Sequence, residues 1–141
     1  IGRGAARFVV DFADPLSGSP GESLSRLQMF RANFARPVLQ AEYRDELGIM
    51  RPDFDLGPIL GEFDGKLKYR VPEGASAEEA GEVVWREKQR EDRLRRFKPV
   101  GRWVWSTART EGALARLLMS MGLRPLPKST WFDLGDRRSA S

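Results

Sequence analysis

The residues with the clearest capacity for chemistry are four acids in one short stretch, Asp53, Asp55, Glu62 and Asp64. Turn residues at 56–58 lie between them and predict two short strands joined by a tight turn. Side chains alternate between the faces of a strand, and neighbouring strands lie about 4.8 Å apart. Up to four carboxylates can therefore converge on one face. Such a group repels itself unless a cation or a basic partner compensates, so the stretch is a candidate metal site.

Two absences narrow the chemistry, because the 141 residues include no Cys and no His. Disulfides, thiolate nucleophiles, imidazole bases and metal sites built from Cys or His are excluded. Any metal must be held by oxygen, which favours Mg²⁺ or Mn²⁺ over Zn²⁺. Proton abstraction would fall to Lys, Asp, Glu or metal-bound water. The net charge of +4 mildly favours a polyanionic partner.

The length and composition predict one globular domain that is large enough to bury a core. Hydrophobic residues make up 40% of the chain and charged residues 31%, and no apolar run approaches the length of a membrane span. We therefore expect a cytoplasmic location and no membrane partner. No signal-peptide pattern opens the chain, and the start at Ile1 predicts a piece of something longer.

Periodicity and capping signals predict the order αβββαβα. Ser19, Pro20 and Glu22 form the N-cap, N1 and N3 positions of a capping box, which predicts a helix that ends before Arg36-Pro37. The remaining elements are expected at 38–43, 50–56 and 59–64 (strands), 76–97 (helix), 101–106 (strand) and 112–121 (helix). The expected apolar stripes are Leu27, Phe30 and Phe34 in the first helix, and Leu114, Leu117, Leu118 and Met121 in the last. A helical crossover before the fourth strand allows parallel pairing, so we expect a mixed four-stranded sheet flanked by helices.

The flanks are expected to lie outside the domain at 19–122. Ala5, Val9 and Phe12 stand at helical spacing, so a helix is expected there. Residues 1–18 as a whole are predicted to be the tail of an upstream segment. Residues 123–141 are predicted to be an extended C-terminal tail.

The apolar face of the long helix is interrupted. Val84 and Leu94 fit a stripe, but charged residues stand between them, and we expect Lys88 or Glu87 to face inward. The alternative is a solvated face with i,i+4 ion pairs. Outer basic residues would suit contacts with nucleic-acid phosphates; these are Arg86, Arg93, Arg96 and Lys98. Tryptophans 85, 103 and 105 are expected to be core or interface aromatics rather than platforms for bases.

Several blocks of sequence carry a family resemblance. Pro52-Asp53, then Glu62-x-Asp64 with Lys66 nearby, resembles the PD-(D/E)xK nuclease core. More narrowly, residues 51–54 (RPDF) and 61–65 (GEFDG) are similar to very-short-patch-repair-type endonuclease domains of actinobacterial proteins. Further matches lie at 19–23, 40, 66–69, 87–95 and 103–105, so the resemblance covers roughly residues 19–118.

The resemblance implies a restriction-endonuclease-like fold and a divalent-metal-dependent endonuclease that hydrolyses phosphodiester bonds in DNA. It implies that Asp53 and Glu62 bind Mg²⁺ or Mn²⁺, and that Glu22 contributes from the first helix. Asp64 stands where the broad pattern has Lys, although the narrower group also has Asp-Gly here, which implies a carboxylate that assists the metal site. The resembling domains often follow a winged-helix segment, which implies an upstream DNA-binding partner.

Alternatives stay open at each position. Glu22 can be only the capping acid, and Asp64 only a turn residue. Lys66, roughly 6.6 Å along the strand from Asp64, can replace the missing lysine or be surface charge. Lys88 could reach the site from the helix instead. RNA is not excluded as a substrate. The main rival function is a nuclease fold without turnover that binds nucleic acid or protein within a larger regulator; a structural role in an assembly is the third.

Overall fold

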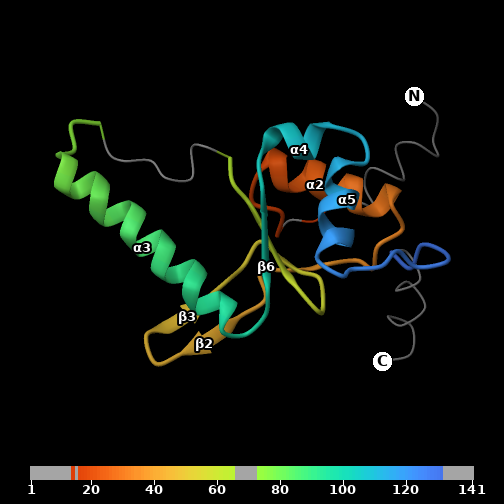
Figure 1. The fold of residues 1–141 in the computed structure, drawn as a ribbon, viewed down its shortest axis with the longest axis horizontal. Helices are drawn as coiled ribbons and strands as arrows, with labels where there is room; N and C mark the ends of the chain where they lie inside the picture. Colours follow the sequence, from red (N-terminus) through yellow and green to blue (C-terminus); the bar gives the residue numbers. More distant parts are fainter. Residues whose placement is uncertain (1–13, 15, 66–72, 132–141) are drawn as a thin grey trace.

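The structure is a computed structural model that describes residue 14 and residues 16–65 and 73–131. The helix expected from the spacing of Ala5, Val9 and Phe12 and the candidate Lys66 lie outside the described residues. The elements, labelled as in Figure 1, are α2 (Pro20–Arg31), β1 (Val38–Leu39), β2 (Tyr43–Asp45), β3 (Gly48–Met50), β4 (Phe54–Asp55), β5 (Leu60–Phe63), α3 (Ala77–Arg95), β6 (Val100–Trp103), α4 (Trp105–Arg109) and α5 (Ala113–Ser120).

The main sheet has the order β1-β4-β5-β6. β1 pairs antiparallel with β4 and β4 antiparallel with β5, whereas β5 and β6 are parallel because α3 carries the chain back between them. The prediction of a mixed four-stranded sheet flanked by helices is confirmed. An additional two-stranded hairpin, β2–β3, is inserted between the first two strands of this sheet.

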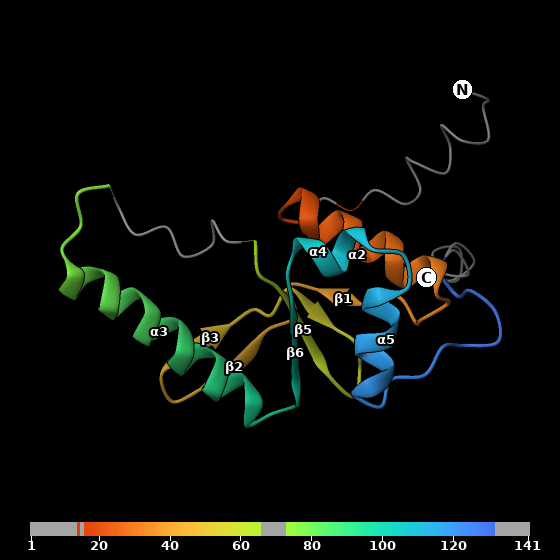
Figure 2. The same cartoon turned by 45° about the horizontal axis from the view of Figure 1, so that its top comes forward.

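The two faces of the sheet have different coverings. The main core includes Phe54, Phe63 and Trp103 on one face, and buried side chains of α2, α4 and α5 pack against it. Phe54 and Trp103 stack with their ring centroids 5.5 Å apart. On the other face a small cluster of Leu60, Val100 and Met50 packs against Leu94 of α3. Figure 2 shows α3 and the other three helices on separate sides of the sheet.

Helix α2 begins where the capping signal predicts, but only the Ser19 half of the capping box forms, because the Glu22 carboxylate accepts the Gly18 N–H and not that of Ser19. The Ser19 hydroxyl accepts the Glu22 N–H at 3.2 Å. The expected stripe is only partly correct, because Leu27 and Phe30 are half-buried while Arg26 and Met29 are buried. Phe34, the third stripe residue, is also buried but follows the helix rather than belonging to it.

Three predicted strands are shorter than expected. The strand expected at 38–43 is broken at Gln40, whose φ of 54° lies in the left-handed region. The strand expected at 50–56 is interrupted between Met50 and Phe54. The strand expected at 101–106 ends at Trp103, and Trp105 begins α4 instead of continuing on the same face.

Helix α3 has the predicted capping box at Ser76 and Glu79. Leu94 is its only buried residue, and the expectation that Val84 belongs to the apolar stripe is wrong because Val84 is exposed. Trp85 is 60% exposed. The N-terminal half of α3 therefore projects from the body, as Figures 1 and 2 both show.

The C-terminal part of the described chain returns to the core. Helix α5 buries Leu114 and Leu118 as predicted. The segment 122–131 has no helix or strand, yet Leu123 and Trp131 are buried in the main core. The Trp131 indole N–H donates to the Phe34 carbonyl at 2.7 Å. Within the described residues no helix is long and apolar enough to cross a membrane.

Candidate functional site

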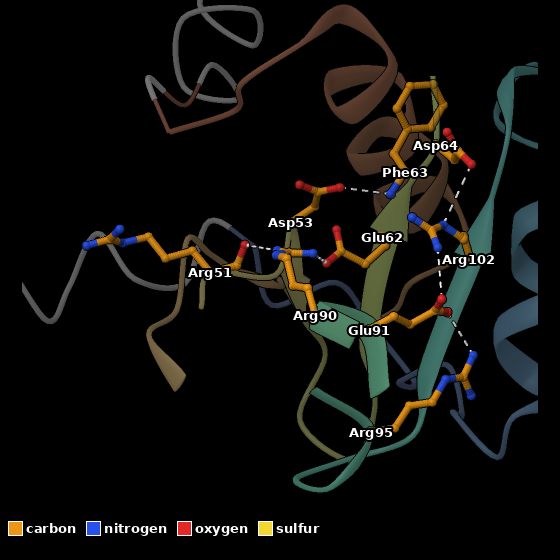
Figure 3. A network of polar contacts seen from close by, with 9 residues as sticks. All are labelled: Arg51, Asp53, Glu62, Phe63, Asp64, Arg90, Glu91, Arg95 and Arg102. Atoms are coloured by element: carbon orange, nitrogen blue, oxygen red, sulfur yellow. Dashed lines mark hydrogen bonds and ion pairs between the residues drawn. The ribbon is translucent and has the colours of Figure 1, made fainter. Parts of the chain in front are cut away.

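Asp53 and Glu62 lie across from each other at the end of the β4–β5 pairing. Phe54 pairs with Gly61, so the next position of the same antiparallel register sets Asp53 opposite Glu62. Figure 3 shows both carboxylates on one side of β5 and the Phe63 ring pointing away. Both acids are buried, Asp53 at 6% and Glu62 at 3% exposure. Two carboxylates held out of water in this way need nearby positive charge or hydrogen-bond donors.

Asp53 is fixed by the backbone of β5. Its Oδ2 accepts the Phe63 N–H at 2.9 Å, a bond that continues the sheet one position past the last backbone pair. Pro52 before it is buried and biases Arg51 towards an extended conformation. The loop between β3 and β4 is therefore short and constrained where it presents the acid.

Glu62 lies in the middle of the sheet and receives an arginine from α3. The Arg90 Nη1 lies 2.7 Å from Glu62 Oε1, and the Arg90 Nη2 donates to the Arg51 carbonyl at 2.8 Å (Figure 3). This guanidinium, only 25% exposed, spans the helix, the central strand and the loop before Asp53. Charge-assisted bonds of this kind are about twice as strong as neutral ones.

Asp64 lies farther along β5 and joins a second chain of ion pairs. Its Oδ2 lies 3.7 Å from Nε of Arg102, and Nη1 of Arg102 donates to Glu91 at 2.9 Å. Glu91 in turn accepts from Arg95 at 2.9 Å (Figure 3). The buried Asp64 Oδ1 has no hydrogen-bond partner among the residues that the structure describes. That oxygen is free to accept a hydrogen bond or to bind a cation.

The structure does not bring all the predicted carboxylates together around one point. Across residues 14, 16–65 and 73–131, no three acidic side chains are grouped so that they could hold one metal ion. The Glu22 Oε2 accepts the Gly18 N–H at 2.6 Å, so Glu22 acts as a capping acid here. Asp55 turns to Tyr43 and Lys98 instead. The Asp53–Glu62 pair still fits Mg²⁺ or Mn²⁺, because Mg²⁺ is commonly held by one or two carboxylates with water and phosphate.

The basic residues predicted for the helix occupy other places. Lys88 is exposed, and Arg90 is the cation of α3 that contacts Glu62. Arg86 and Arg96 are exposed as expected, each near a glutamate. Arg93 does not lie on the outer side as expected, because it pairs with Asp45 of the hairpin, and its contact with phosphate stays a prediction.

Lys98 is likewise turned inward. Its Nζ lies 3.0 Å from Asp55 Oδ1, and the Tyr43 hydroxyl donates to the same carboxylate. Burial alone would raise the pKa of Asp55, but bonds from Tyr43, Gly57 and Lys98 lower it overall. The hydrogen bond with Tyr43 and the pairing with Asp55 raise the pKa of Lys98. Lys98 therefore does not lie on the outer side as expected either, and its contact with phosphate stays a prediction.

Two arginines that contact the candidate site, Arg90 and Arg102, were not predicted from the sequence, although it carries signals for both. Arg90 lies within the turns where the apolar stripe of the helix fails. Arg102 is the register partner of Glu62 in the parallel β5–β6 pairing, and it precedes the buried Trp103 along β6. Strand alternation would have put Arg102 on the acidic face.

Comparisons of the chain with family models, with curated proteins and with solved structures give no match. What the site can do chemically therefore follows from its own residues. These are two buried acids opposite each other, an arginine on one of them, and a third acid with an available oxygen on the same face.

Proposed function

We propose that the chain is a divalent-metal-dependent endodeoxyribonuclease with a restriction-endonuclease-like core. The observation that carries this proposal is the pair of buried acids, Asp53 directly before β4 and Glu62 on β5, which the β4–β5 register sets opposite each other. The resemblance of residues 51–65 to the PD-(D/E)xK core and the mixed sheet with its helical crossover support it. Burying two such carboxylates side by side is costly in a fold, so a requirement for cation binding explains their presence.

In this proposal Asp53 and Glu62 hold Mg²⁺ or Mn²⁺ and Asp64 assists, whereas Glu22 would have to release the Gly18 N–H before it could assist as well. The ion, when bound, would activate water and neutralise charge on the scissile phosphodiester. Asp53 keeps its orientation through the Phe63 N–H, and Glu62 is held by the rigid central strand. The available Asp64 oxygen could accept a proton from an attacking water molecule.

The proposed nuclease also needs a cation near the phosphate. Lys66, two residues after Asp64, keeps this role in the proposal, and Lys88 becomes a weaker candidate because it is exposed. A Lys66→Ala variant should lower the cleavage rate with little change in metal affinity. Lys88→Ala should retain the wild-type rate.

The decisive experiment measures Mn²⁺-dependent nicking of supercoiled plasmid DNA. Asp53→Asn should lower the rate at least about 100-fold, because several kcal/mol of transition-state stabilisation depend on the ion. The fold should survive, since the asparagine Oδ1 can still accept the Phe63 N–H. Asp92→Asn on the exposed side of α3 removes the same charge outside the site and should leave the rate unchanged. Equal rates for wild type and Asp53→Asn would show that other residues are catalytic.

A second candidate function is favoured by Arg90. Because this arginine already compensates Glu62, the acidic pair can persist without any metal. The chain would then be an inactive nuclease-fold module that binds nucleic acid or a protein partner. Wild-type protein that retains DNA or RNA in a filter-binding assay, but cuts neither with Mn²⁺, would establish that alternative over the nuclease.

A further inference from the structure

Among the described residues, Arg90 is the cationic side chain of α3 that contacts the acidic pair. It reaches from α3, one turn before the buried Leu94, to Glu62 Oε1 at 2.7 Å (Figure 3). Its second nitrogen is held by the Arg51 carbonyl at 2.8 Å, at the start of the loop that carries Asp53. The guanidinium therefore lies at the edge of the proposed metal site.

Binding of a divalent cation to the acidic pair would disturb the ion pair between Arg90 and Glu62. One guanidinium, with a single positive charge, pairs with the acid most deeply buried in the site, Glu62. A divalent ion between Asp53 and Glu62 would repel Arg90 and compete for the same Oε1. Arg90 is 25% exposed, so its head can move towards solvent without crossing the apolar core.

We infer that Arg90 is an exchangeable counter-ion: it holds Glu62 in the metal-free protein, yields that oxygen to the divalent cation, and then contacts the phosphodiester. The inference rests on the proposed nuclease function and deepens it. An arginine suits both positions, because its planar fork bonds to carboxylates and phosphates in the same bidentate geometry. Its tether on α3 keeps it above the acidic face after release.

The inference predicts effects of opposite sign in two measurements. Arg90→Gln removes the competitor, so Mn²⁺ should bind about tenfold more tightly, within the usual range of coupling between two ligands of one site. DNA cleavage should nevertheless fall about 100-fold, because a charged contact that forms on the phosphate is lost. A residue with only a structural role would weaken both.

The test is titration calorimetry with Mn²⁺ alone, in the absence of DNA, on wild-type protein, Arg90→Gln and Arg90→Lys. Arg90→Lys keeps the charge but cannot hold Glu62 and the Arg51 carbonyl together, so its affinity should lie between the other two. Arg95→Gln, a neutralised arginine of the same helix bonded to Glu91, is the matched control and should bind like wild type.

Tighter binding by Arg90→Gln, with an unchanged near-ultraviolet spectrum, would support the inference. Equal or weaker binding would overturn it even if wild-type protein cuts DNA, and the proposed function would stand. Should Arg90→Gln fail to fold, Arg90→Lys decides on the same criterion. The function itself fails separately, when wild-type protein binds Mn²⁺ but cuts no DNA. Absence of Mn²⁺ binding by every variant would overturn both.

Discussion

Gly21 has no side chain, and this lets α2 approach the sheet closely. A Cβ atom added to Gly21 would lie 2.1 Å from Cε1 and 2.2 Å from Cζ of Phe63, closer than carbon atoms can pack. Phe63 follows Glu62 and donates its N–H to Asp53. The close contact between Gly21 and the Phe63 ring therefore helps to fix the stretch of β5 that positions both acids.

Gly21→Ala should lower the free energy of unfolding by about 1–3 kcal/mol, the usual cost of overpacking a core. Alanine ordinarily stabilises a helix relative to glycine, so the expected sign is reversed here. The matched control is Gly81→Ala in α3, where an added Cβ meets nothing within 4 Å. That variant should gain about 0.5–1 kcal/mol. Urea unfolding of the two variants measures both values, and equal shifts would show that α2 can move away freely.

The site was predictable in part at this scale. Strand alternation and a tight turn suffice to put Asp53 opposite Glu62, because register follows from a few local residues. The partner on α3 was harder to choose. Lys88 and Arg90 are about 200° apart around a helix axis, and the broken apolar stripe marks the turn without fixing its rotation. Tertiary packing at Leu94 turns Arg90 inward and leaves Lys88 exposed.

At the scale of elements, α3 is attached to the body mainly through ion pairs. It buries only Leu94, while Arg90 pairs with Glu62, Glu91 with Arg102, and Arg93 with Asp45. The last pair joins the helix to the inserted β2–β3 hairpin. The Asp45 carboxylate also accepts the Leu47 N–H at 2.8 Å, which shapes the hairpin turn.

The attachment of the hairpin should depend on pH. The hydrogen bonds from Arg93 lower the pKa of Asp45 to about 2, below its ordinary value near 3.8. A lowered pKa in the folded state means that the pair adds stability above the unfolded pKa. That stability is lost as pH falls through the folded pKa. Wild type should therefore exceed Asp45→Asn in stability at neutral pH, and the difference should vanish between about pH 4 and pH 2.

Urea unfolding between pH 2 and pH 7 measures this difference. Glu46→Gln is the control, because Glu46 is exposed and lies 3.5 Å from an exposed Arg96. Exposed pairs of this kind contribute about 0–1 kcal/mol, so this variant should follow wild type closely. A constant difference between wild type and Asp45→Asn down to pH 2 would contradict the role assigned to Arg93.

The strands show why element boundaries were less predictable than their order. β1 and β4 are two residues each, too short to carry a periodic signal of their own. Gln40 takes a left-handed backbone conformation that its residue type does not announce. The hairpin depends on Arg93 of α3, which is 45 or more positions away along the chain from its partners Asp45 and Gly48. By contrast, the capping residues Ser19 and Ser76 are local signals and mark both helix starts correctly.

At the scale of the whole molecule, the sheet separates stability from chemistry. One face is covered by α2, α4 and α5 and holds most of the buried apolar side chains. The other face carries Glu62, Asp64 and Arg102 under the charged side of α3. A polar face can be tolerated because the opposite face supplies the core. The proposed site thus lies where changes of charge disturb packing least.

The segment after α5 belongs to that core. Trp131 is 1% exposed, donates to the Phe34 carbonyl at 2.7 Å, and meets the Phe30 ring edge-on with centroids 5.5 Å apart. The guanidinium of Arg26 lies over the same indole at 5.6 Å. Sequence patterns did not reveal this because a lone tryptophan among Pro, Lys, Ser and Thr carries no periodicity. Trp131 is buried because it packs on the side chains at α2, a contact between segments far apart in the sequence.

Two tryptophans allow a direct comparison of buried and projecting parts. Trp131→Ala should lower the free energy of unfolding by about 3–5 kcal/mol, because it leaves a cavity and an unpaired Phe34 carbonyl in the core. Trp85→Ala removes the same side chain from the projecting half of α3 and should change stability by no more than about 0.5 kcal/mol. Urea unfolding followed by circular dichroism measures both. A small loss for Trp131→Ala would mean that residues 123–131 lie on the domain as a separable strap, and that the core under α2 is complete without them.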